Sequence, residues 1–220
     1  MSITGKNVTY EQLAPLLKTG DIVLFHGDSH FQDIIDKLTG SPYNHMAMVV
    51  LSKDLGGDDT MAPIMLWEST PYAITEDQRL HRPKAGPTLV DLKTRIDQEV
   101  ERGMFFRFVF RRLATPLNTG NFKKLKHAIT PAYPDKFPTD WWFFIKGILG
   151  RIFNREAQPS TFFCSELIAY TYQKMGLLST KHPPDYYWPK DFSLKGQIDL
   201  LQNETLGENL LLELQIKNES

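Results

Sequence analysis

The sequence lacks a second cysteine, because Cys164 is the single cysteine among its 220 residues. One thiol excludes a disulfide within the chain, so nothing in the sequence requires an oxidising compartment. No apolar run approaches the roughly 18 residues that a membrane-spanning helix needs. The 25 lysines and arginines are matched by 26 aspartates and glutamates, without the basic excess typical of nucleic-acid-binding proteins. The sequence therefore predicts neither a transmembrane protein nor a nucleic-acid partner.

Residues 1–20 also lack the basic segment and the following apolar run of a secretory signal peptide. We therefore expect a cytoplasmic protein, and a periplasmic location would require that a signal had been removed. Hydrophobic residues make up 41% of the chain and aromatic residues 12%, which is enough for a substantial core. The length suits one domain, which we assign to residues 1–220.

Patterns of apolar residues predict mainly strands in the first half of the chain and mainly helices in the second. Strands are expected at 21–26, 45–51, 64–69 and 104–111, with weaker alternation at 88–92. Helices are expected at 10–17, 31–38, 121–130, 141–153 and 161–175, the last with Gly176 as its C-terminal cap. For 209–217 the periodicity leaves strand and helix open. Strands followed by helices predict an α+β fold rather than alternating βαβ units.

Cys164 lies in the first part of the helix predicted for 161–175. A thiol in the first helical turn feels the positive end of the helix dipole, which favours the thiolate. The alternative is a small buried side chain without chemistry, which is the commoner role of a lone cysteine. A redox-sensing thiol is a third possibility, although the chain has no resolving cysteine. A nucleophilic role requires a nearby base and an acceptor that orients that base.

Six histidines compete for the role of base. His45 opens the apolar strand 45–51 directly after a turn, so its ring is expected at a sheet rim, where it can be oriented and still reach a cleft. The alternative is a rim histidine bonded to the backbone. His26 and His30 do not share a continuous helix, and no second cysteine or acidic cluster completes a metal site with them. The other three are expected to face solvent: His81, His127 and His182.

Glu68 is the acid that the pattern singles out, because it interrupts the otherwise uncharged strand 64–69. Alternation places it on the face shared by Ile64 and Leu66. A carboxylate on an apolar face is costly unless it is paired. His45 would be a natural partner if the two strands were neighbours, and the alternative is a strand-end glutamate with its carboxylate in water.

Four short segments occur in a fixed order along the chain: Gly20–Leu24, Ser41–Val49, Trp67–Ser69 and Phe163–Ile168. In this order, with the histidine strand before the cysteine helix, they resemble the circularly permuted NlpC-like papain-fold hydrolases, the YiiX/YaeF-like group. Lecithin retinol acyltransferase-like enzymes are more distant relatives. The resemblance covers roughly residues 17–192.

The resemblance implies a permuted papain-like α+β fold, with an antiparallel sheet or open barrel packed against helices and the cysteine helix against the sheet. It implies that Cys164 is the nucleophile, His45 the base and Glu68 the residue that orients the base. The chain departs from the family's core in a long helical and aromatic stretch. We therefore expect residues 119–158 to be a helical insertion.

These residues predict a cysteine-dependent hydrolase that works through an acyl-enzyme, and the resemblance implies an amide of a peptide, isopeptide or cell-wall peptide as the substrate. The alternatives are a lipid or thioester acyl hydrolase or acyltransferase, and a binding module with an inert buried cysteine. The apolar segment 141–153 is expected to pack on the core, or alternatively to form an acyl-chain wall with peripheral membrane contact. The expected partner is a small-molecule, peptide or lipid acyl substrate, and no cofactor or metal is expected.

Overall fold

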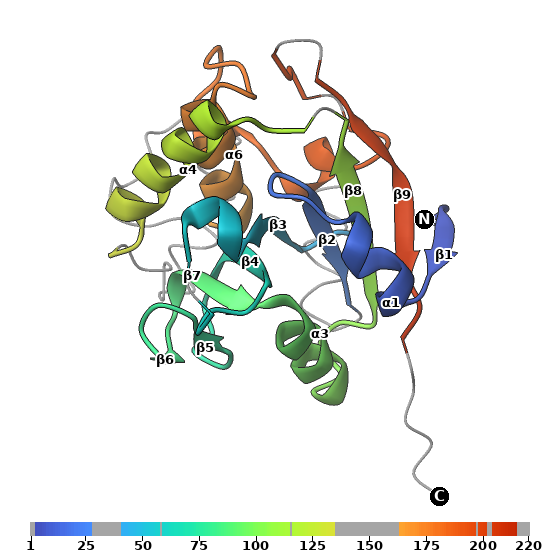
Figure 1. Ribbon diagram of the computed structural model, residues 1–220. Helices are drawn as coiled ribbons and strands as arrows, with labels where there is room; N and C mark the ends of the chain where they lie inside the picture. The colour runs from blue at the N-terminus through green and yellow to red at the C-terminus, as the bar shows by residue number, and fades with distance from the viewer. Residues whose placement is uncertain are drawn as a thin grey trace, which may run out of the picture.

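The computed structural model describes residues 3–27, 41–57, 59–114, 116–134, 163–196, 198–201 and 204–214. Within these residues the strands form one nine-stranded sheet in the order β1-β9-β8-β2-β3-β4-β7-β5-β6 (Figure 1). Neighbouring strands run antiparallel, except that β1 is parallel to β9. The strands are β1 (Lys6–Val8), β2 (Ile22–His26), β3 (His45–Leu51), β4 (Ile64–Thr70), β5 (Glu76–Asp77), β6 (Arg82–Pro83), β7 (Gly86–Asp91), β8 (Arg107–Leu113) and β9 (Leu206–Leu212).

Helices pack against this sheet, which confirms the expected α+β architecture of an antiparallel sheet with helices. In the described residues they are α1 (Tyr10–Leu13), α3 (Leu92–Glu101), α4 (Thr119–Ala132) and α6 (Cys164–Met175), together with short 3-10 turns. The cysteine helix α6 contacts β3 and β4, as expected, and α4 lies beside it (Figure 1). None of the described helices is both long and apolar enough to cross a bilayer.

The two faces of the sheet carry separate apolar cores, because successive side chains of a strand point to opposite sides. On β3, Met46, Met48 and Val50 belong to the core that includes the buried residues of α4 and α6. Ala47 and Val49 belong to the other core, which includes buried residues of α1 and α3. Nearly every residue of β3 is buried because both faces are covered.

β3 and β4 separate at one end, and this separation creates space for the site. Their antiparallel pairing runs from Leu51↔Ile64 to Met48↔Trp67 and goes no further. Yet β3 begins at His45 and β4 continues to Thr70. The first residues of β3 and the last of β4 therefore flank a gap within the sheet.

Several sequence-based boundaries need correction. The helix expected at 10–17 ends at Leu13 and continues as a 3-10 turn over Ala14–Leu16, since Pro15 lacks the N–H that a further helical turn would use. The strand expected at 104–111 runs from Arg107 to Leu113, and the undecided 209–217 segment pairs with β8 as β9, Leu206–Leu212.

Other expectations are confirmed or lie outside the described residues. The strands at 45–51 and 64–69 and the helix at 121–130 are present with shifts of no more than about two residues, which is the usual uncertainty of a boundary. Gly176 ends α6 in the left-handed conformation at φ 77°, as a C-terminal cap requires. The helices expected at 31–38 and 141–153 lie outside the described residues, as does most of the proposed 119–158 insertion beyond α4.

Candidate active site

The three residues singled out in the sequence lie together in the structure. His45 is the first residue of β3, Glu68 belongs to β4, and Cys164 is the first residue of α6. His45 Nε2 lies 2.5 Å from Glu68 Oε2. The Cys164 thiol interacts with the same imidazole closely enough that each group shifts the pKa of the other. Because Nε2 is engaged by the carboxylate, Nδ1 is the ring nitrogen that remains for the sulfur.

The gap between β3 and β4 explains how side chains from opposite faces of the sheet meet. Cys164 comes from α6, which packs on the face of Met46, whereas Glu68 lies on the face of Leu66, as alternation predicted. Met46 lies past the last pair of β3 and β4, and its N–H lowers the pKa of the Cys164 thiol. The thiol therefore lies near the start of β3, where the two strands separate.

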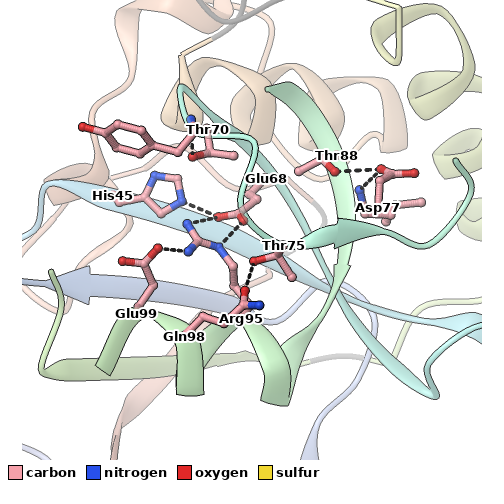
Figure 2. Close-up of polar contacts among 11 residues, drawn as sticks. His45, Glu68, Thr70, Thr75, Asp77, Thr88, Arg95, Gln98 and Glu99 are labelled. Carbon is pink, nitrogen blue, oxygen red and sulfur yellow. Dashed lines mark hydrogen bonds and ion pairs between the residues drawn. The ribbon is translucent and has the colours of Figure 1, made fainter. Parts of the chain in front are cut away.

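A buried arginine holds both oxygens of the Glu68 carboxylate. Arg95 Nε lies 2.5 Å from Glu68 Oε1, and Arg95 Nη2 lies 3.5 Å from Glu68 Oε2. Arg95 Nη1 also hydrogen-bonds Glu99, one turn further along α3. Figure 2 shows this continuous chain of side chains, from the imidazole through the carboxylate and the guanidinium to the second carboxylate. Glu68, Arg95 and Glu99 are 0%, 3% and 2% exposed, so solvent screens their charges little.

Charge partners raise the pKa of His45 although the ring is buried. Burial by itself disfavours the imidazolium and lowers the pKa. Hydrogen bonds and charge from Cys164 and Glu68 outweigh burial and raise the pKa from 6.5 to about 9. The imidazolium is therefore the favoured form of His45 at neutral pH.

The neighbouring groups shift in the complementary direction. Burial raises the pKa of the Cys164 thiol, but His45 and the N–H groups of Met46 and Ser165 outweigh it, so the pKa lies below its ordinary value. Burial also raises the pKa of Glu68, but the charge of Arg95 and the contact with His45 lower it from 4.5 to about 2. Together these shifts favour an imidazolium facing a thiolate, with an ionised carboxylate behind the ring.

Two aromatic rings lie close to the imidazole. The ring of Phe25 packs edge-on at 4.8 Å between centroids, and the ring of Phe105 lies at 6.1 Å. Phe25 is fully buried, and its ring also contacts Phe105. These rings limit the access of water to His45 from their side.

The other histidines take no part in this arrangement. His26 Nδ1 donates to the carbonyl of Pro42 at 2.6 Å. His81, His127 and His182 are exposed, as expected from the sequence. His30 lies outside the described residues. In the described part of the chain, no three side chains of histidine, cysteine, aspartate or glutamate are grouped so that they could hold a metal ion.

Sequence reasoning missed Arg95 and Glu99, because it assigned no element to residues 93–103. The signal was present: Leu92 and Ile96 are four residues apart, and Asp91 is a suitable N-cap whose side chain accepts from Thr94 N–H. It also missed Asn44, next to His45, whose side-chain amide nitrogen and oxygen are buried without a hydrogen-bond partner among the residues that the structure describes.

Comparisons with known proteins add little to this geometry. No family model matches the chain. No curated protein matches it either. Among solved structures, it is similar to the metalloprotein YiiX from Escherichia coli O157:H7, with 20% identity and a TM-score of 0.45 over 72% of this chain. The chain spans just under two thirds of that protein, 66% of its length. A likeness this distant carries no argument about function, so the site is interpreted from its own residues.

Proposed function

We propose that the protein is a cysteine-dependent hydrolase that cleaves an amide through an acyl-enzyme. Cys164 is the nucleophile, His45 the general base and acid, and Glu68 the residue that orients the imidazole. The observation that carries the proposal is the hydrogen bond between the His45 imidazole and the buried, ionised carboxylate of Glu68, together with the pKa shifts that His45 and Cys164 impose on each other. A thiol, a base and an orienting acceptor within contact are the arrangement that nucleophilic catalysis needs.

The reaction takes two steps. The Cys164 thiolate attacks the amide carbonyl carbon, and the imidazolium of His45 gives its Nδ1 proton to the amide nitrogen as the carbon–nitrogen bond breaks. The product is an acyl thioester on Cys164 and a free amine. Water then attacks the thioester while His45 accepts a proton from the water, and the carbon–sulfur bond breaks to restore the thiolate and the imidazolium.

The first turn of α6 supplies stabilisation for the oxyanion. The helix begins at Cys164, and the N–H groups of a first helical turn have no acceptors within the helix. The N–H of Ser165 contributes to the lowered pKa of Cys164, which supports a role for this turn at the reacting sulfur. One backbone donor of this kind is worth about 10²- to 10³-fold in rate in other enzymes.

Trapping the covalent intermediate tests this proposal. The wild-type protein is incubated with a panel of peptides, isopeptides, thioesters and phospholipids, and its intact mass is measured after rapid acid quench. We expect a mass increase from an amide donor, on Cys164, which peptide mapping locates without ambiguity because the chain has one cysteine. Cys164→Ala should form no adduct. An adduct that persists in Cys164→Ala, or the absence of any adduct or turnover with every donor, would contradict the proposal.

The same panel separates the amide hydrolase from the two alternatives. Adduct formation from thioesters or phospholipids alone would favour an acyl hydrolase or acyltransferase for lipids. The segment that suggested a lipid substrate, 141–153, lies outside the described residues, so this alternative stays a prediction from the sequence. A binding module with an inert cysteine would react with iodoacetamide no faster than a free thiol at the same pH.

A further inference from the structure

Arg95 and Glu99, which are connected to the imidazole through Glu68, have contacts that a purely structural ion pair does not need. Arg95 engages both oxygens of Glu68, and its remaining Nη1 engages Glu99. All three side chains are buried. A buried ion pair is weak support for stability, because its desolvation offsets most of its attraction, and apolar side chains of the same volume often serve as well.

We infer that Arg95 and Glu99 are positioning residues of the proposed hydrolase. Arg95 fixes the plane of the Glu68 carboxylate, and Glu99 fixes Arg95, so that the carboxylate holds the His45 ring toward Cys164. This inference rests on the proposed function. It assigns two further residues to it, neither of which touches the thiol.

The geometry gives Arg95 a role that a lysine cannot fill. The guanidinium is a planar fork, and its Nε and Nη2 reach the two oxygens of Glu68 while Nη1 reaches Glu99. A lysine ammonium has the same charge but a single nitrogen, so it cannot hold both carboxylates in this plane. Arg95→Lys therefore removes the positioning while it keeps the charge.

Glu99 completes the charge behind the ring. Among the described residues, the charged groups linked to His45 come from three elements: Glu68 of β4 and Cys164 of α6 act on the ring directly, and Arg95 and Glu99 of α3 are connected to it through Glu68. Without Glu99, the guanidinium would balance Glu68 completely. With Glu99, the group behind the imidazole carries one net negative charge, which favours the imidazolium.

The chain offers a matched control on the same helix. Glu101 lies two residues after Glu99, at the end of α3, and it is exposed. Glu99→Gln and Glu101→Gln make the same chemical change and remove the same charge. Only Glu99 belongs to the chain of contacts that leads to His45.

The experiment compares the pH profiles of turnover for wild type, Glu99→Gln and Glu101→Gln. Loss of an anion near the ring makes it easier to deprotonate both the Cys164 thiol and the His45 imidazolium. Glu99→Gln should therefore move both the acid and the alkaline limb of the pH profile to lower pH. The alkaline limb should move by roughly half to one pH unit, because a buried charge is screened little. Glu101→Gln should leave both limbs unchanged. Arg95→Lys should lower the turnover number about tenfold, a size common for supporting residues of a site, with little change in the limbs.

Identical limbs in Glu99→Gln and Glu101→Gln, or wild-type turnover in Arg95→Lys, would overturn the inference. A purely structural role would lower the melting temperature without moving the limbs, and thermal melts of each variant detect this. The NMR titration of the His45 ring in Glu99→Gln requires no substrate. If no donor is cleaved, the proposed function fails, whereas a lower His45 pKa in this titration still supports the link from Glu99 to the imidazole, and an unchanged pKa refutes it.

Discussion

Glu68→Gln removes the charge at the centre of the buried cluster, and its effect on stability depends on pH. The native pKa of Glu68 is about 2, below its ordinary value of 4.5, because Arg95 and His45 outweigh the effect of burial. A carboxylate whose pKa is lowered on folding stabilises the protein above its unfolded pKa, and this stabilisation is lost as the pH falls through the native pKa. The stabilisation by Glu68 is therefore lost as the pH falls from about 4.5 to about 2.

The size of the effect follows from the two pKa values. At about 1.4 kcal/mol per pKa unit, the lowering from 4.5 to about 2 corresponds to about 3 kcal/mol of stability at neutral pH. At pH 3 the unfolded carboxylate is almost entirely protonated while the native one is still mostly ionised. About 2 kcal/mol of this stabilisation is then already lost, which leaves about 1 kcal/mol. A glutamine in place of Glu68 has no such dependence.

The assay is urea unfolding of wild type, Glu68→Gln and the exposed control Glu101→Gln near pH 6 and pH 3. Near pH 6, Glu68→Gln should lose about 3 kcal/mol of unfolding free energy, in the range found when one partner of a buried ion pair is removed. The decrease in unfolding free energy from pH 6 to pH 3 should be about 2 kcal/mol smaller in Glu68→Gln than in wild type. The reasoning is refuted if Glu68→Gln and Glu101→Gln show the same pH dependence, because Glu68 would then titrate as an ordinary carboxylate.

Three further predictions concern single residues around the site. His45→Ala should slow the alkylation of Cys164 by iodoacetamide at pH 7 at least about tenfold, because the thiol loses the charge that lowers its pKa. Mass spectrometry over time measures the rate, and an unchanged rate would contradict the ion pair between Cys164 and His45. Turnover in wild type should fall above about pH 9 as the raised pKa of His45 is passed, and a rate that is still rising at pH 10 would contradict the imidazolium as the acid. Asn44→Ala should change the unfolding free energy by less than about 1 kcal/mol, because the buried amide has no hydrogen bond to lose; a larger loss in chemical unfolding would reveal a partner.

The sequence predicted the three central residues because each one breaks a local pattern. His45 opens an apolar strand, Glu68 interrupts another, and Cys164 stands at a helix start. Each was therefore visible without knowledge of its partners. The contact between His45 and Glu68 required that β3 and β4 be neighbours, which the sequence posed as a condition and the structure confirms. The gap between these strands was not predictable, because it depends on where their pairing stops.

Arg95 and Glu99 were missed for a different reason. The segment Leu92–Glu101 is rich in charged residues, and an exposed charged segment has the same composition as one whose charges are buried in pairs. What distinguishes the two is the carboxylate of β4 that meets Arg95, and this contact spans 27 positions of sequence. The helix left a local signal in the spacing of Leu92 and Ile96 and in its N-cap, but the pairing of Arg95 with Glu68 leaves no local periodicity, so pattern reasoning could find the helix and not the contact.

The buried cluster solves a conflict between the two charges that a thiol nucleophile needs nearby. A carboxylate that favours the imidazolium also repels the thiolate and, when buried, tends to take up a proton. Arg95 engages both oxygens of Glu68 and keeps the carboxylate ionised. The N–H groups of Met46 and Ser165 favour the thiolate without adding a net charge. In the proposed mechanism a guanidinium therefore compensates the carboxylate while uncharged dipoles favour the thiolate, so that the imidazolium and the thiolate are both favoured at one site.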